Sequence, residues 1–252
     1  MMSLSLLRIE GYKLIRLPLT WVLMSISLLL ISLLFYRLCV DYLQLAQQNL
    51  HLQGQAPSIS VEIIKPLCSW TIILFATLLP LLTANAFSQE FRQKTFYLLA
   101  TSHKASSIVL AKYVSLFIMF SVQVAALLLI IATLNFETAL DWGMITSAIL
   151  AIIGIGSCFL SFGLFMSSLT SWPLVAIGLT FLGYLFWLLL EWLNPFPAQG
   201  FFLAKELSLL SHSYRLLNGM IYIPDLLYYV FFSIFWLVLC HFRIAHKLVN
   251  VE

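Results

Sequence analysis

The feature that most constrains this chain is the spacing of its charged residues, which leaves long intervals with none. The longest interval runs from Trp142 to Leu190 without Asp, Glu, Lys or Arg. A helix needs about 20 apolar residues to cross roughly 30 Å of hydrocarbon, so this interval is too long for one crossing. A polar break at 167–173, ending in a proline, divides it. The interval therefore predicts two membrane-spanning helices.

The composition is that of a membrane protein. Of the 252 residues, 62% are hydrophobic and 9% are charged, and the mean hydropathy is +1.01. The apolar runs lack the alternation of barrel strands, so we predict an all-α polytopic protein with one transmembrane domain over residues 1–252, embedded in a lipid bilayer. The six predicted spans are 17–36, 66–89, 113–136, 142–166, 173–191 and 226–245.

The basic residues predict the orientation of these helices. If the N-terminus is cytoplasmic, nine of the 13 Lys and Arg residues lie inside and the other four lie outside. This bias predicts that both termini are cytoplasmic. The inside set is Arg8, Lys13, Arg16, Arg92, Lys94, Lys104, Lys112, Arg243 and Lys247, and the outside set is Arg37, Lys65, Lys205 and Arg215.

Two charged segments are expected at the cytoplasmic membrane surface. Residues 5–16 alternate charged and apolar side chains ahead of Pro18, which predicts an amphipathic interfacial helix. The insert at 89–107 is also amphipathic and predicts a short helix, with a solvated loop whose charges only fix topology as the alternative. Its apolar residues at helical spacing are Phe91, Thr95, Leu98 and Leu99.

The outer segment before the last span is expected to approach the bilayer. Within 194–225 the Asn194-Pro195-Phe196-Pro197 run breaks the preceding helix, and the residues after it are apolar enough for two short interfacial or re-entrant helices.

The fourth span has a face of small residues, which predicts close helix packing. We favour packing within the chain over contact between two copies. The face contains Gly154, Gly156 and Gly163.

No residue pattern indicates chemistry performed by this chain. The Gly-x-x-x-x-Gly-Lys-Ser/Thr phosphate loop is absent, the five histidines lack metal-ligand spacing, and no nucleophile has a base beside it. We therefore expect no catalytic residue, no metal and no cofactor on this chain. The uncharged span interiors disfavour ion-coupled transport, and a net charge of +3 does not suggest nucleic acid. A disulfide between Cys39 and Cys68 is left open, and Cys158 and Cys240 are expected to be buried thiols.

The insert resembles the signature of type-two ABC transporter permeases. In that family a Glu is followed by Gly-Thr, a Leu-Leu pair, Ser-Pro and then Gly-Lys or Ala-Lys at the start of the third span. Lys94 stands where Gly is usual and His103 where Pro is usual. The matching residues are Glu90, Thr95, Leu98, Leu99, Ser102, Ala111 and Lys112.

A second region, His212-x6-Gly219-x-Ile221-x3-Asp225-x2-Tyr228, is similar to the segment before the last span in the branch of that family concerned with gliding motility and nitrous-oxide-reductase maturation. From the residues alone, Asp225 is expected to cap the last helix after Pro224.

The resemblance implies a bacterial inner-membrane permease, an exporter, that pairs with a second copy or a related permease. It also implies two cytoplasmic ABC ATPase subunits, which bind ATP and magnesium and contact the insert as a coupling helix. The coupling residues would be Glu90, Arg92, Thr95, Leu98, Leu99, Ser102 and Lys112, with a periplasmic accessory protein at the outer segment left open. The alternative is a non-transporting membrane scaffold in a maturation or motility complex.

Overall fold

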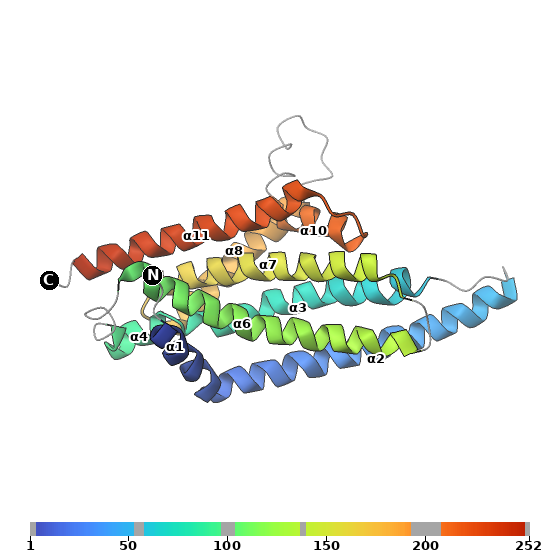
Figure 1. The fold of residues 1–252 in the computed structure, drawn as a ribbon, viewed down its shortest axis with the longest axis horizontal. Coiled ribbons are helices and arrows are strands. Elements are labelled where there is room, and N and C mark those ends of the chain that lie inside the picture. The colour runs from blue at the N-terminus through green and yellow to red at the C-terminus, as the bar shows by residue number, and fades with distance from the viewer. Residues whose placement is uncertain (1–3, 53–57, 97–103, 137–139, 193–207, 250–252) are drawn as a thin grey trace.

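The computed structural model describes residues 4–52, 58–96, 104–136, 140–192 and 208–249, and every regular element in these ranges is helical (Figure 1). Two short elements are the π-helix η1 (Ser60–Ile64) and the 3₁₀-helix η2 (Thr133–Phe136). The α-helices are α1 (Leu4–Arg16), α2 (Pro18–Leu52), α3 (Lys65–Ala84), α4 (Ser88–Gln93), α6 (Ala105–Ala132), α7 (Trp142–Leu169), α8 (Pro173–Trp192), α10 (Leu209–Leu217) and α11 (Ile223–Val249).

The prediction of an all-helical membrane protein is confirmed. Within the part of the chain that the structure describes, five helical segments are long and apolar enough to cross a bilayer, so the predicted count of six is not confirmed. The fifth predicted span, 173–191, corresponds to α8. α8 has 20 residues, and the apolar stretch counted on its described side chains, Pro173–Trp187, is shorter than the other five segments. The five long segments are Pro18–Gln48, Ser60–Gln93, Ala105–Asn135, Trp142–Leu169 and Ile223–Lys247.

The first long helix extends well beyond its predicted span of 17–36. α2 has 35 residues, about 52 Å at 1.5 Å per residue, and its C-terminal end projects beyond the other helices (Figure 1). The polar residues after Tyr36 therefore continue the helix beyond the thickness of a bilayer. Proline marks the start of this helix and of α8, at Pro18 and Pro173, because it has no N–H to leave unpaired at the first helical position.

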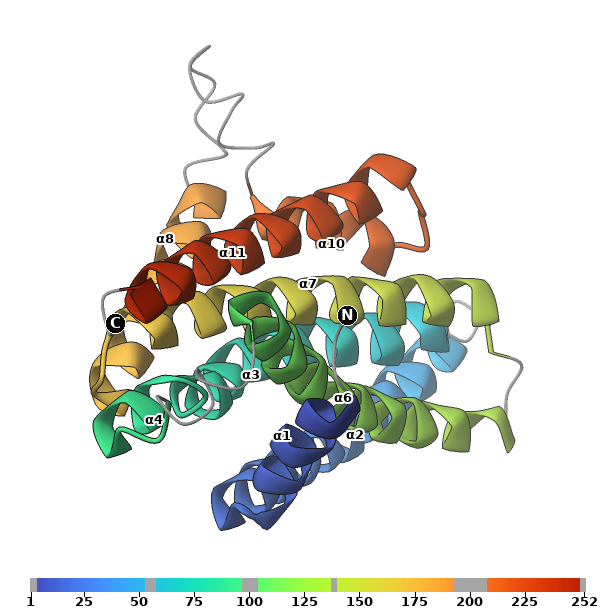
Figure 2. The ribbon, with the colours of Figure 1, turned by 60° about the vertical axis from the view of Figure 1, so that its left-hand side comes forward.

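The central element is α7, which packs against α3, α6, α8, α10 and α11 (Figures 1 and 2). Three glycines allow this close packing, since a Cβ at Gly154 would lie 2.5 Å from the Tyr229 ring and one at Gly156 would lie 2.2 Å from the Phe120 ring. The small-residue face of the fourth span thus packs within the chain. Cys158 and Cys240 are buried, as expected, and all four cysteines are free thiols.

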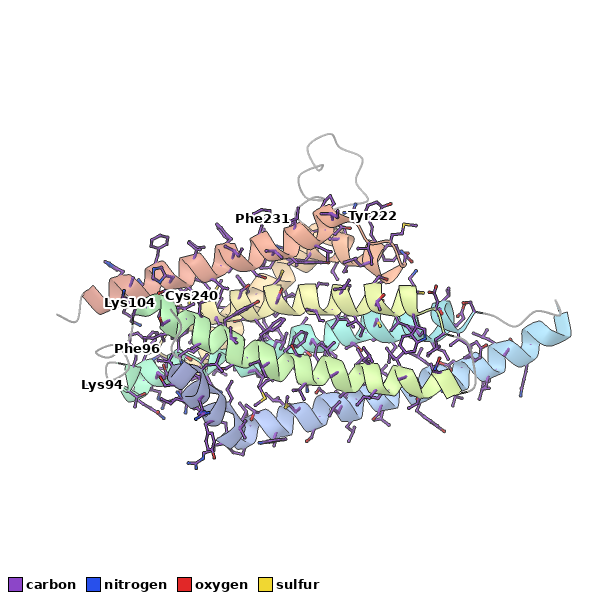
Figure 3. All side chains as sticks on the ribbon, viewed as in Figure 1. Lys94, Phe96, Lys104, Tyr222, Phe231 and Cys240 are labelled. Carbon is purple, nitrogen blue, oxygen red and sulfur yellow. The ribbon has the colours of Figure 1, made fainter. Side chains whose placement is uncertain are left out.

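The two ends of the bundle differ. The N-terminus, the C-terminus, α1 and α4 lie at one end, and the start of α3 and the C-terminal part of α2 lie at the other (Figures 1 and 2). Figure 3 places Lys94 and Lys104 at the first end, far from Tyr222. We call these the α4 end and the α10 end. Both termini therefore share an end with the charged insert.

Candidate functional site

The α4 end contains a buried network of opposite charges. The Lys112 ammonium, on α6, donates to Oε1 and Oε2 of Glu10, on α1, at 3.0 and 3.1 Å. It also donates to Oε1 of Glu90, on α4, at 2.6 Å, and Lys13 donates to the same oxygen. We call Glu10, Lys13, Glu90 and Lys112 the ionic network. It joins α4 and α6 to α1, which is far from both in the sequence.

The burial of this network makes its pairing important for stability. Glu10, Glu90 and Lys112 are exposed by only 4%, 1% and 3%, so bulk solvent does not surround their charges. An isolated buried charge is very costly, whereas two carboxylates with two ammonium groups are neutral overall. Lys112 also lies 5.2 Å from the centroid of the Phe87 ring, a favourable position for a cation. The network thus holds α1 against α4 and α6.

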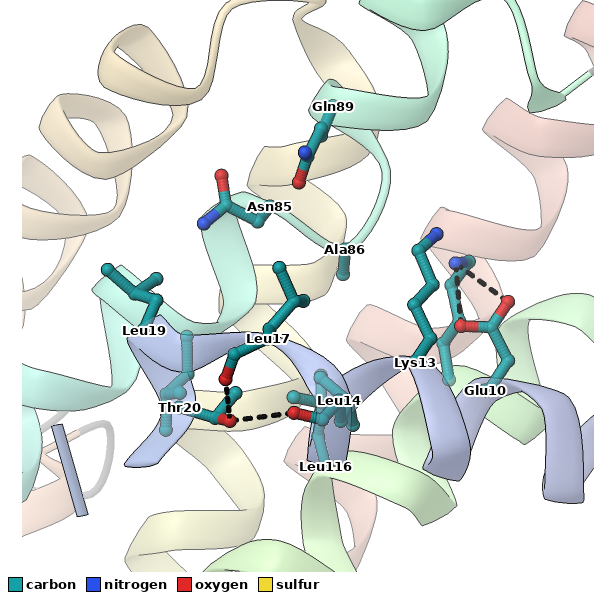
Figure 4. A pocket seen from close by; sticks show the side chains of 12 residues that line it. Glu10, Lys13, Leu14, Leu17, Leu19, Thr20, Asn85, Ala86, Gln89 and Leu116 are labelled. Carbon is teal, nitrogen blue, oxygen red and sulfur yellow. Dashed lines mark hydrogen bonds and ion pairs between the residues drawn. The ribbon is translucent and has the colours of Figure 1, made fainter. Parts of the chain in front are cut away.

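The corner between α1 and α2 is closed by side-chain hydrogen bonds next to the network (Figure 4). Thr20 donates to the carbonyl oxygens of Leu14 and Leu17 at 2.6 and 2.7 Å, and the Trp21 indole donates to that of Ile15 at 2.7 Å. A cavity of about 30 Å³, lined partly by Glu10, Lys13 and Lys112, lies here and is large enough for one water molecule.

The other face of α1 is apolar and open. Ile9, Tyr12 and Ile15 are about half exposed. This pattern agrees with the predicted interfacial helix, since such a face can lie in the headgroup region.

The start of α4 is fixed by a serine of the central helix. Ser167 Oγ accepts from the backbone N–H groups of Phe87 and Ser88 at 3.1 and 3.2 Å, and it donates to the carbonyl of Ala84 at 2.8 Å. The first N–H groups of a helix have no partner within it, so a side chain from α7 supplies the missing acceptor. The Phe87 and Phe91 rings stack on each other, and Phe87 belongs to the buried core, which anchors the start of α4 to the bundle.

The insert is not the single helix predicted over 89–107. α4 ends at Gln93, Lys94 has φ of 58° in the left-handed region, and Lys104 is extended before α6 begins at Ala105. Lys94 is the position at which the resembling family has Gly, the residue that adopts this φ without steric cost. Leu98, Leu99 and Ser102 lie outside the described residues.

The predicted coupling residues divide into buried and exposed groups. Glu90 and Lys112 belong to the ionic network, so in this structure they cannot form a contact surface for a partner. Arg92 and Thr95 are exposed, as is Lys94 between them. The Arg92 guanidinium lies 5.0 Å from the Trp172 ring, and Lys247 lies 3.3 Å from the Phe91 ring. We call Arg92, Lys94 and Thr95 the exposed tip.

A second cluster lies toward the α10 end and unites three of the four predicted outer residues. Asp225 is fully buried, and its Oδ1 lies 2.7 Å from His212 Nδ1. Arg215 Nε donates to Asp225 Oδ2 at 3.0 Å, and its Nη2 donates to Oδ1. The Tyr228 ring stacks on the His212 ring with centroids 4.3 Å apart. Asp225 thus connects α10 to α11.

Asp225 therefore does not have the role of helix cap that the sequence suggested. α11 already begins at Ile223, so Asp225 lies in its first turn, and its carboxylate bonds to side chains of α10. Gly219 has φ of +83° and forms the turn after α10, where a residue with a Cβ would be strained. α10 is one of the two short helices expected here. Residues 193–207 lie outside the described ranges.

Sequence reasoning missed Glu10, Ser167 and Arg215. Glu10 appeared only as one charge of an amphipathic helix, and its pairing with Lys112 spans 102 positions. A weak signal existed, because Glu10 lies four residues from both Leu6 and Leu14, on the face of α1 that these leucines share. Within the described residues no group of His, Cys, Asp and Glu side chains could hold a metal ion.

Comparison with models of known protein families found no match to this chain, and comparison with curated proteins found none either. The geometry of the ionic network and the exposed tip is therefore the basis for a functional proposal.

Proposed function

We propose that this chain is the membrane-spanning permease subunit of an ATP-driven ABC exporter in the bacterial inner membrane. In this proposal α8 completes a six-span topology, both termini are cytoplasmic, and α10 is a re-entrant or interfacial helix on the outer side. The functional complex has two permease subunits and two cytoplasmic ATPase subunits, which bind ATP and magnesium.

The observation that carries the proposal is the buried ionic network. It connects an interfacial helix, the α4 segment and a long apolar helix through Lys112, so the three move together. A push on the exposed tip is then transmitted to α6 and to α1. This arrangement suits a chain that receives movement from a partner, since the chain itself lacks a phosphate loop.

In this proposal the exposed and the buried residues of the insert have different roles. Arg92, Lys94 and Thr95 would contact the ATPase, while Glu90 and Lys112 would hold α4 in position from below. Charges on an exposed patch give orientation and specificity to a transient contact.

The proposal is tested by purifying the chain from bacterial membranes with its bound partners and measuring ATPase activity in lipid nanodiscs. We expect a P-loop ATPase to copurify, and Arg92→Glu to weaken its retention several-fold. Arg37→Glu, an exposed arginine beyond the predicted outer surface, is the matched control and should leave retention unchanged. Copurification of a stable complex without any ATPase would instead support the scaffold alternative and contradict a transport role.

A further inference from the structure

A groove between α3, α8 and α10 lies apart from both charged clusters. Its main cavity has a volume of about 300 Å³. Ile72 and Ala76 of α3, Tyr184 and Trp187 of α8, and Leu210 of α10 contribute to its lining, which is almost wholly apolar. This volume lies at the lower end of the range of small-molecule sites in proteins.

The groove becomes polar toward the α10 end. A second cavity of about 180 Å³ shares Ile72 and Leu210 with the first and adds Ser69, Ser213 and Tyr214. At this end the Lys65 ammonium lies 4.8 Å from the centroid of the Tyr214 ring. Among the described residues, no carboxylate lies within ion-pair distance of Lys65. The groove therefore has an apolar end and a cationic end.

The length of the groove is close to half the thickness of the hydrocarbon core of a bilayer. Lys65, Ser69, Ile73 and Thr77 follow each other at intervals of four along α3, so the groove extends along one face of that helix. The 12 helical steps from Lys65 to Thr77 correspond to about 18 Å of helix, close to half of the roughly 30 Å hydrocarbon thickness. Lys65 is the first residue of α3, where a headgroup would lie.

The groove is open on the side that faces the bilayer. Ile73 on α3 and Leu185 on α8 are 50% and 52% exposed, and both contribute to its lining. A molecule could therefore enter sideways from the lipid phase without crossing the bundle. Bilayer lipids are the amphiphiles that surround this surface at high concentration.

We propose that the groove binds one anionic phospholipid of the bilayer, with an acyl chain in the apolar cavity and the phosphate beside Lys65. The match of charge supports an anionic headgroup, because the Lys65 ammonium at this end can donate to phosphate oxygens, whereas the Ser69 and Ser213 hydroxyls already donate to backbone carbonyls. The proposal does not depend on a transport function, since the site is formed by one copy of the chain.

The experiment uses the full chain in phosphatidylcholine nanodiscs doped with a phosphatidylglycerol that carries a photoactivatable group on its acyl chain. Peptide mapping is expected to find crosslinks at Ile72, Ala76 and Leu210. Ala76→Trp, or Ala76→Leu if the larger residue unfolds the chain, should remove these crosslinks. Leu29→Trp, on the exposed apolar face of α2, should leave them unchanged.

The headgroup is tested by competition between phosphatidylglycerol and phosphatidylcholine probes. Lys65→Gln should reduce the preference for the anionic lipid about five-fold, the effect of one lysine near an anionic surface. Arg37→Gln should not change it. An unchanged preference in Lys65→Gln, or an even spread of label over all lipid-facing helices, would overturn the proposal.

Discussion

At the scale of single residues, the buried charges are the most demanding feature of this chain. Glu10, Glu90, Lys112 and Asp225 are almost completely buried, and each lies within hydrogen-bond distance of an opposite charge. Removing one member of such a pair leaves the other charge buried without compensation, which costs more than losing both. Single substitutions at these positions should therefore be far more disruptive than substitutions at exposed charges.

Lys112→Met should lower the free energy of unfolding by about 3–5 kcal/mol, because it leaves Glu10 without an ammonium partner and Glu90 with only the half-exposed Lys13. Thermal unfolding of the purified protein in detergent measures this. Lys104→Met, an exposed lysine just before α6, is the matched control. Equal midpoints for the two variants would show that the network contributes little to stability.

Asp225→Asn should lower stability by about 1–3 kcal/mol, since the amide cannot balance the charge of the partly exposed Arg215 and replaces one of the two carboxylate acceptors with a donor. Asp41→Asn, which removes an exposed ion pair within α2, should change it by less than about 1 kcal/mol. A double-mutant cycle with Arg215→Met gives the coupling directly. Additive effects of the two substitutions would argue against the pairing.

At the scale of elements, α7 organises the bundle because its small residues allow neighbouring helices to approach. Gly156→Leu should destabilise the protein by about 1–3 kcal/mol or prevent its folding, since the Phe120 ring occupies the space of the new side chain. Gly178→Leu, at a glycine of α8 with open space around it, is the control. Phe120→Ala in the same chain should partly rescue Gly156→Leu, and failure of that rescue would contradict direct packing.

A substitution at the end of α4 should stabilise the protein rather than destabilise it. Lys94→Gly should raise stability by about 1 kcal/mol, because glycine adopts the left-handed conformation without the clash of a Cβ. Lys94→Ala removes the same charge without this freedom and should give no gain. Chemical unfolding curves of both variants distinguish the two effects. A gain in Lys94→Ala alone would point to charge, not backbone strain.

At the scale of the whole molecule, the lateral surface is apolar. α2 and α11 expose many large side chains, including Leu33 and Phe235, and Phe231 points away from the bundle (Figure 3). A surface of this kind needs lipid or another membrane helix around it. The membrane environment therefore follows from the fold as well as from the composition.

Orientation is tested by cysteine labelling in intact bacteria. In a Cys39→Ser background, Arg92→Cys and Lys104→Cys should react with a membrane-impermeant reagent only after the cells are lysed. Asn218→Cys, exposed in the turn after α10, should react in intact cells. Labelling of Arg92→Cys from outside the cell would rule out a cytoplasmic partner at the exposed tip.

Much of this fold could be predicted from the sequence, and the errors have identifiable causes. The uncharged intervals predicted the long helices. They also placed the end of the first helix at Tyr36, which was wrong, because polar and charged residues end the membrane-embedded part of a helix without ending the helix itself. The insert was predicted as one helix from the spacing of Phe91 and Thr95. The left-handed Lys94 that ends it has no signature in a single sequence.

The candidate site was predictable only in part. The resemblance singled out Glu90 and Lys112, but it could not reveal that both are buried or that Glu10 joins them. Similarly, the motif around Asp225 was visible, whereas its partner Arg215 was not. In both clusters the missing information is a contact between side chains distant in sequence.

By itself, the sequence determined that this chain is a helical membrane protein. The free energy of transferring a helix into lipid depends on the composition and length of its apolar run, and both can be read from the sequence. Only the tertiary structure decided which charges are buried and which are exposed. The cost of burying a charge depends on what stands next to it, and for Lys112 those neighbours come from two other helices.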